Sequence, residues 1–461
     1  MTRNFWLLVH RWGGLLMAVP LIIVGLTGAI LAFDSEVNHL VTPERYAAPQ
    51  PGVPTLTLDT LAARAQALVP PEGAILMLQL GPENARAMIM PPRDMAAMTA
   101  RMKGGLSLSM LIFGPGDVWK DSPFRPFMLY LDPWTGKVLD KQTTGGGLFG
   151  EGVMPFIHQL HDRLALGFFG DWVIGLIALL WTLDCFVAYY LTFPISRRRE
   201  GQAVTAVQSW WSRWKPSWKI KANASTYRLN LDLHRASGLW LWPLLFVFAW
   251  SSVQFKLRPV YDVVTGAVFE YRSPREQRAQ KQQQTNRQQI RLEAEKYSNH
   301  GEPLPKIGEL LATARRLAGE EGLKRNINLG EPSIYLQQPG SNLVSVNFLP
   351  ESAACQGESV PQCMVTVMFD ARSGSLVQLT MPEQQSVMNP KLPNEPVGNF
   401  VTRWLFKLHK GQGLGLWYRI LVCVSGIVIA MLSVTGVYLW WKKRRVRTSG
   451  VRSAELTVAE A

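Results

Sequence analysis

The sequence predicts an α-helical membrane protein with four transmembrane helices, arranged as a pseudo-repeat, and two external α+β domains. Three observations predict this class. Hydrophobic residues make up 47% of the 461 residues and charged residues only 18%, which is low for a soluble protein. Four apolar stretches are long enough to cross a hydrocarbon core of roughly 30 Å, which takes about 20 residues of helix. The two long segments between these stretches each contain a helix followed by strands.

The first predicted span lies near the N-terminus and is expected to be an uncleaved anchor. Its apolar run exceeds the hydrophobic region of a secretory signal peptide, and no A-x-A cleavage site follows it. The predicted spans cover residues 12–33, 168–193, 237–257 and 416–441.

The distribution of Lys and Arg predicts the orientation of these spans. Positive side chains are concentrated in the loop 194–236 and in the tail 442–461, and such residues stay on the cytoplasmic side of a membrane. Both termini and this loop are therefore predicted to be cytoplasmic, and the segments 34–167 and 258–415 to lie on the other side. The net charge of +14 is explained by this topology, in which positive side chains anchor the protein to anionic lipid. We therefore predict no nucleic-acid partner.

The two external segments show the same order of elements. Residues 54–69 have helical spacing of apolar side chains and precede strand-like runs, the last of which is broken by a D-P-W-T-G turn. A helix near 305–318 precedes a second set of strand-like runs, and here the turn reads D-A-R-S-G. Each segment is therefore predicted to form a small α+β unit.

Two of the four cysteines, Cys355 and Cys363, lie in a polar hairpin loop of the second unit. On an oxidising side of the membrane, two cysteines this close are expected to form a disulfide. The pair thus indicates a compartment rather than a catalytic role. Cys185 and Cys423 lie inside predicted spans, where a small buried hydrophobic side chain is the ordinary interpretation.

Five of the seven histidines lie at the ends of the predicted spans. His10 opens the sequence HRWGGLL and His234 opens HRASGLW, whereas His161 and His409 stand in LHDRLALG and LHKGQGLG. This correspondence predicts two pairs, His10 with His234 at the cytoplasmic ends and His161 with His409 at the external ends. Two neutral imidazoles between helices are a natural set of axial ligands for haem iron.

A histidine at a helix end also has an ordinary interpretation as an interfacial polar residue. Four corresponding positions, each followed within a few residues by Gly, favour haem, because Gly lets a planar ring approach a helix. His158 precedes His161 by one helical turn and is either an alternative ligand or a hydrogen-bond donor near it. Arg11 and Arg235 follow two of the histidines and either pair with haem propionates or only mark the cytoplasmic side.

The sequence contains no dinucleotide-binding fold. The loop 194–236 is too short for a βαβ pair, so electrons are expected from quinol or from a cytoplasmic reductase. Asp184 is a carboxylate inside the second predicted span. Its pattern leaves open whether it is a functional proton site or a hydrogen-bond partner of a neighbouring helix.

Nearly the whole chain resembles the PepSY-associated transmembrane family. The resemblance rests on HRWGGLLMAVPLIIVGLTGAILAF, YLDPWTGKVLD, LHDRLALGFFGDW, MFDARSGSLVQL, LHKGQGLGLWYR and SVTGVYLWWKKRR. Members are bacterial inner-membrane proteins often tied to iron uptake, and some are similar to haem-containing reductases of ferric siderophores in the periplasm. The resemblance implies PepSY-like external domains, two b-type haems and a ferric siderophore as substrate. The sequence departs from a strict repeat in the third span, where AWSSVQF replaces GLTGAILAF.

The predicted function is therefore an inner-membrane di-haem electron-transfer protein that reduces ferric siderophore in the periplasm and releases Fe²⁺. No catalytic acid or base of the protein is predicted. Two alternatives remain: a haem-free PepSY protein with a regulatory or binding role, and a transporter subunit for iron or siderophore. The apolar centres of the spans argue against a substrate path, and the haem content of the protein separates the first alternative from the reductase.

Overall fold

The structure, a computed structural model, divides the chain into two compact units. One, which we call the helical unit, contains Met1–Asp34, Ile157–Ser273 and Lys391–Ala461, and the other, the sheet unit, contains Ser35–Phe156 and Pro274–Pro390. The residues that the structure describes are 2–91, 124–143, 152–194, 209–273, 276, 297, 304–325, 327–338, 340–350, 364–380 and 395–459.

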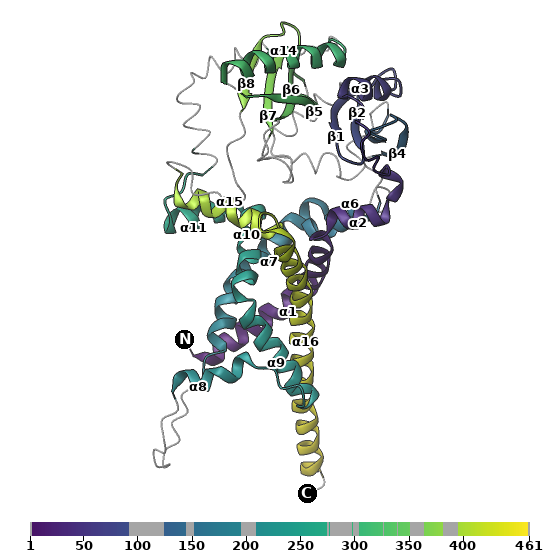
Figure 1. Cartoon of the computed structure of the whole chain (residues 1–461). Coiled ribbons are helices and arrows are strands. Elements are labelled where there is room, and N and C mark those ends of the chain that lie inside the picture. The colour runs from purple at the N-terminus through teal and green to yellow at the C-terminus, as the bar shows by residue number, and fades with distance from the viewer. Residues whose placement is uncertain are drawn as a thin grey trace. The chain divides into compact units, whose positions relative to one another are not determined.

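The helical unit contains three helices that are long and apolar enough to cross a membrane, counted over the described residues. They are α1 (Arg3–Leu31), α7 (Gly167–Leu191) and the Gly415–Arg445 part of α16 (Gly415–Ala459) (Figure 1). A further apolar segment consists of two helices, α9 (Thr226–Trp240) and α10 (Trp242–Lys256), which meet at an angle of 70°.

The prediction of four transmembrane helices in a pseudo-repeat is therefore wrong. A fourth crossing exists only if the bent pair α9 and α10 counts as one span. The break follows from Pro243 in the first turn of α10, because proline lacks the backbone N–H and its ring clashes with the carbonyl one turn earlier. The run 239–250 around the break is apolar throughout, so hydropathy alone did not reveal the break.

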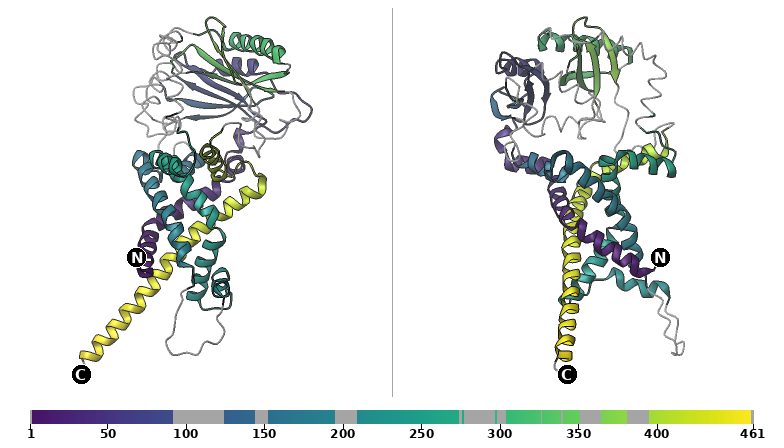
Figure 2. Two further views of the ribbon diagram at one scale, coloured as in Figure 1. Left: turned by 90° about the vertical axis from the view of Figure 1, so that its left-hand side faces the viewer. Right: turned by 180° about the vertical axis from the view of Figure 1, so that it is seen from behind.

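Helices α1 and α16 pack at the centre of this unit. A Cβ atom added at Gly25 would lie 2.6 Å from the carbonyl oxygen of Gly426, so the two backbones meet at a pair of glycines, as is common between membrane helices. Figure 2 shows these two helices crossing side by side. Other residues of the same two helices, Thr27 of α1 and Thr435 of α16, contact the histidines described below.

Shorter helices flank the spans. Two of them, α6 and α15, end just before α7 and α16 begin and carry His161 and His409. The bounds of the shorter helices in both units are α2 (Asp34–Val41), η1 (Pro43–Arg45), α3 (Leu58–Gln66), α6 (Val153–Arg163), α8 (Trp210–Trp214), η3 (Lys215–Trp218), α11 (Arg258–Val268), α14 (Ile307–Arg325) and α15 (Val397–His409).

The sheet unit contains one antiparallel sheet of eight strands in the order β4-β3-β2-β1-β5-β6-β7-β8. Its strands are β1 (Ala74–Leu80), β2 (Ala85–Met90), β3 (Phe127–Leu131), β4 (Val138–Thr143), β5 (Leu329–Gln337), β6 (Leu343–Pro350), β7 (Val365–Asp370) and β8 (Leu376–Thr380). Helices α3 and α14 cover one face, where Leu61, Leu311 and Phe369 are fully buried.

The prediction of two separate external domains is also wrong, because β1 pairs directly with β5. Met77 lies opposite Leu336 and Gln79 opposite Ile334. Two separate four-stranded sheets would each leave these strands as an unpaired edge, and the pairing at Met77–Gln79 gives backbone N–H and C=O groups of both edges a partner. The strand patterns of the sequence predict where strands form but do not specify which edges meet.

Candidate functional site

Four histidines of the helical unit form two pairs. His10 of α1 and His234 of α9 have ring centroids 6.1 Å apart, and we call them the first pair. His161 of α6 and His409 of α15 also have ring centroids 6.1 Å apart, and they form the second pair. The ring planes make angles of 63° and 66°. The structure thus brings together the histidines that the sequence pattern matched.

His10 is held by a carboxylate. Its Nδ1 atom lies 2.9 Å from Oδ1 and 3.0 Å from Oδ2 of Asp184 in α7. The Asp184 side chain is only 10% exposed, so the interaction is shielded from water. Of the two interpretations that the sequence left open for this carboxylate, the structure shows the hydrogen bond to a neighbouring helix.

His161 and His234 are held by the same local arrangement on two different helices. Nδ1 of His161 lies 3.0 Å from the Val24 carbonyl oxygen and 3.1 Å from the Thr27 hydroxyl of α1. The arrangement repeats on α16, where Nδ1 of His234 lies 3.0 Å from the Leu432 carbonyl oxygen and 3.1 Å from the Thr435 hydroxyl. Both imidazoles therefore dock on a carbonyl and a threonine of one helical turn.

His409 is held by a serine hydroxyl. Its Nδ1 atom lies 2.7 Å from Oγ of Ser251 in α10. The same hydroxyl lies 2.6 Å from the Val247 carbonyl oxygen and 3.1 Å from the Phe248 carbonyl oxygen. When its proton goes to one of these carbonyls, the hydroxyl oxygen accepts from Nδ1–H of His409. Ser251 is fully buried, and Phe248 and Phe255 pack edge-on against the His409 ring.

These contacts fix the tautomer of three rings. Nδ1 of His10 faces a carboxylate, and Nδ1 of His161 and of His234 each face a backbone carbonyl oxygen, and such oxygens can only accept. These three Nδ1 atoms therefore carry the hydrogen and leave a lone pair on Nε2, and His409 takes the same form when the Ser251 hydroxyl donates to a backbone carbonyl. An imidazole whose Nδ1–H is held by an oxygen while Nε2 stays open is the form in which histidine usually binds metals.

Glycines adjoin the imidazoles. A Cβ atom at Gly28 would lie 2.9 Å from Cε1 of His161, and one at Gly436 would lie 3.3 Å from Cε1 of His234. One turn beyond each histidine of the first pair stands another glycine, Gly14 after His10 and Gly238 after His234. Among described residues, only the Leu432 side chain, at 3.9 Å from the Gly238 position, comes within 4 Å of a Cβ at either site. Gly28 and Gly436 thus let the two rings lie close against α1 and α16, and Gly14 and Gly238 leave open space on the helices that carry the first pair.

Burial keeps the second pair uncharged. Desolvation by the surrounding helices lowers the pKa of His161 to about 4 and the pKa of His409 to about 3. Both imidazoles are therefore neutral at pH 7, which is the protonation state that a metal ligand needs.

The two pairs lie near opposite ends of α1. His10, close to the start of this helix, belongs to the first pair, and Thr27, close to its end, touches His161 of the second pair. With a rise of about 1.5 Å per residue from His10 to Thr27, the two levels are about 25 Å apart along the helix axis.

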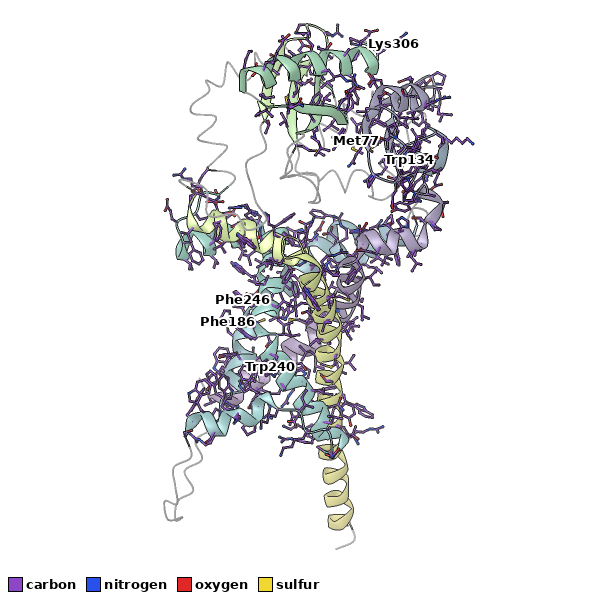
Figure 3. The ribbon with its side chains drawn as sticks, viewed as in Figure 1. Met77, Trp134, Phe186, Trp240, Phe246 and Lys306 are labelled. Carbon is purple, nitrogen blue, oxygen red and sulfur yellow. The ribbon has the colours of Figure 1, made fainter. Side chains whose placement is uncertain are left out.

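Phe186 of α7 and Phe246 of α10, labelled in Figure 3, pack on each other with ring centroids 5.3 Å apart.

The remaining predicted site residues lie elsewhere. His158 points to Asp34 at 3.1 Å and is 57% exposed, so it is not part of the second pair. Arg235 hydrogen-bonds to Asp232 and to the Pro216 carbonyl oxygen, and its buried Nε atom has no partner among the described residues. Cys355 and Cys363 lie outside the described residues, so their disulfide stays a prediction.

The oxygen partners of the histidines were not predicted from the sequence. A signal was present, because the spacing from His10 to Thr27 is the same as the spacing from His234 to Ser251. A second signal is the dipeptide Thr-Gly, which stands at 27–28 and again at 435–436. The described residues contain no group of three or more His, Cys, Asp or Glu arranged to hold a metal ion.

Comparison with known families places the chain. The family described as PepSY-associated TM region matches residues 7–443, which is nearly the whole chain, and no curated protein matches it. The chain therefore belongs to this family and is a membrane protein of the PepSY-associated type.

Proposed function

We propose that this member of the PepSY-associated family is an inner-membrane di-haem electron-transfer protein that reduces ferric siderophore in the periplasm and releases Fe²⁺. One observation carries the proposal: two pairs of neighbouring imidazoles, each with Nδ1 held by an oxygen and Nε2 open. Bound haem iron would supply reversible one-electron transfer at each pair.

The residues fit a bis-histidine haem. Two metal–nitrogen bonds of about 2 Å each, with the radii of two imidazole rings, separate the centroids by about 6 Å, and both pairs have 6.1 Å. The Gly28 and Gly436 positions beside the rings would be filled by any side chain. Covalent c-type attachment needs a C-x-x-C-H motif, which the sequence lacks, so a b-type haem is the form that fits.

The protein's own residues orient and protect the ligands. Asp184, Thr27, Thr435 and Ser251 are all buried and fix the ring orientation through Nδ1. Such partners of metal-bound histidines commonly account for a tenfold to hundredfold effect on affinity or activity. The buried Nε of Arg235, the residue after His234, has no partner among the described residues and would be free to donate to an anionic propionate.

The orientation that we propose follows the positive charge. Arg11, Arg228 and Arg235 lie near the first pair in sequence, and Lys442 to Arg445 end the apolar part of α16. Positive residues stay cytoplasmic, so the first pair lies toward the cytoplasm and the second pair toward the periplasm.

The reaction balances with a donor of known chemistry. A quinol, or a reduced flavin of a cytoplasmic reductase, loses two electrons and two protons, and these electrons convert two Fe³⁺ ions of two chelates into two Fe²⁺ ions. Hard oxygen ligands hold Fe²⁺ less strongly than Fe³⁺ because its charge is lower. Release of iron therefore requires no acid or base from the protein.

Anaerobic mixing of the reduced protein with a ferric trihydroxamate chelate tests this function. The full-length protein is reduced, freed of reductant and mixed with the chelate and an Fe²⁺-specific chromogenic trap. We expect reoxidation of the protein spectrum to match the Fe²⁺ formed, one ion per electron, and His409→Ala to slow it at least tenfold. A haem-containing protein that stays reduced in excess chelate would contradict the proposal.

A further inference from the structure

The four histidines differ in one respect that the proposed function does not use. Three Nδ1 atoms are held by neutral oxygens of backbone carbonyls, threonines or serine. The fourth, that of His10, is held by the carboxylate of Asp184, with both oxygens within 3.0 Å. Among the described residues, a negative charge therefore contacts a ligand ring of the first pair directly, and none contacts a ring of the second pair.

A carboxylate that accepts a hydrogen bond from Nδ1–H changes the reduction potential of iron bound at Nε2 of the same ring. It draws the proton toward oxygen and raises the electron density at Nε2, which strengthens the bond to Fe³⁺ more than the bond to Fe²⁺. Its negative charge also favours the oxidised, more positive centre, and in a low-dielectric interior this interaction is only weakly screened. Both effects lower the reduction potential.

Other charges near the pairs are compensated. Asp162 follows His161, but Lys256 and Arg163 both contact it at 2.6 Å. Near the first pair, the buried Asp232 is paired with Arg228 and Arg235. None of these described groups hydrogen-bonds a ring nitrogen of the four histidines, so Asp184 is the charge that distinguishes the two pairs.

We propose that Asp184 lowers the reduction potential of iron bound by the first pair below that of iron bound by the second pair, and so directs electrons from the first pair to the second. The inference rests on the proposed function. If each pair holds haem iron, iron at the first pair would be oxidised as iron at the second pair is reduced, and the same electron would then reduce the Fe³⁺ of the chelate to Fe²⁺. Asp184 acts through His10 and is a positioning residue, with no contact to the reacting chelate required.

Spectroelectrochemical titration of the purified full-length holoprotein tests this directly. The wild type should show two one-electron waves. Asp184→Asn should move the lower wave to higher potential and leave the upper wave in place, whereas Asp184→Glu should keep the lower wave near its wild-type position. Ser251→Ala is the matched control, because it removes a neutral partner of His409 and should move only the upper wave.

A second variant keeps the test decisive if Asp184→Asn binds haem poorly. His234→Met replaces one imidazole of the first pair by a thioether, which raises the potential, and the wave that rises identifies the first pair. If the upper wave rises, the inference is overturned. It is equally overturned if two haems are bound and Asp184→Asn moves neither wave, while a wild-type protein without haem overturns the proposed function together with it.

Discussion

The first and second histidine pairs share one geometry but differ in electrostatics. Both have ring centroids 6.1 Å apart and oxygen atoms on Nδ1. The first pair includes the carboxylate of Asp184, and the second pair has only the neutral oxygens of Val24, Thr27 and Ser251. Ring position and local charge are therefore separable in this fold, because helix packing repeats the ring positions while single residues on neighbouring helices set the charge.

The largest effect is expected from removing a ligand of one pair. His409→Ala should leave about one haem per chain, because His161 alone cannot supply two axial ligands. His158→Ala is the control on the same side: it is exposed and bonded to Asp34, so two haems should remain. Haem extraction and quantification per chain checks both. If His158→Ala lost a haem, His158 would be a haem ligand, which contradicts the assignment of His161 and His409 as the two ligands on that side.

A side chain at the glycine beside each pair should have unequal effects. Gly28→Ala places a Cβ 2.9 Å from the His161 ring, closer than real Cβ contacts allow, whereas Gly436→Ala places one 3.3 Å from the His234 ring. We expect Gly28→Ala to weaken haem binding at the second pair by about tenfold or more and Gly436→Ala to weaken the first pair far less. Haem titration of the apoprotein measures this, and equal effects would show that ring packing does not limit binding.

Removal of the hydroxyl groups that contact the second pair should have smaller effects on haem affinity, and these effects should differ between His409 and His161. Ser251→Ala takes the hydroxyl from Nδ1 of His409, and we expect about a tenfold loss of haem affinity. Thr27→Val leaves His161 the Val24 carbonyl oxygen, so the expected loss is about threefold or less. The same haem titration orders the two variants, and the reverse order would contradict the tautomer assignment.

The smallest effect concerns the ion pairs beside the second pair. Lys256 contacts Asp162 and Asp171 at 2.6 Å each and is 11% exposed. Lys256→Met removes the shared cation and leaves two carboxylates close together, so we expect a loss of about 1–2 kcal/mol in stability. Thermal unfolding, followed through the absorption of haem bound at the second pair, measures this loss of stability. Arg316→Ala, at an exposed pair of the sheet unit, is the control and should leave the transition unchanged.

The sequence alone predicted much of the helical unit. The positions of α1, α7 and α16 follow from hydropathy, and the local sequences around His10, His234, His161 and His409 were enough to match the partners. It could not predict the oxygens on Nδ1, because Asp184, Thr27, Thr435 and Ser251 approach from helices that are distant in the chain. Their roles arise from tertiary packing, which a single sequence does not display.

The sheet unit shows a different limit of sequence reasoning. The sequence predicted strand-like runs after each of the two helices, but the pairing of β1 with β5 joins segments from opposite halves of the chain. Edge strands satisfy their backbone groups with whichever partner the fold brings near. The bend between α9 and α10 is a local feature that Pro243 signals, yet the apolar run around it resembles a single span.

A haem count on the purified protein tests the central claim, that each histidine pair holds one haem. Oxidised and dithionite-reduced spectra would be recorded for wild type, His161→Ala and His234→Ala, all expressed in haem-replete cells. We predict two haems per chain in the wild type and one in each variant, with a different haem retained in each. A colourless wild-type protein would contradict it, and the pairs would then be hydrogen-bonded contacts of a haem-free membrane protein.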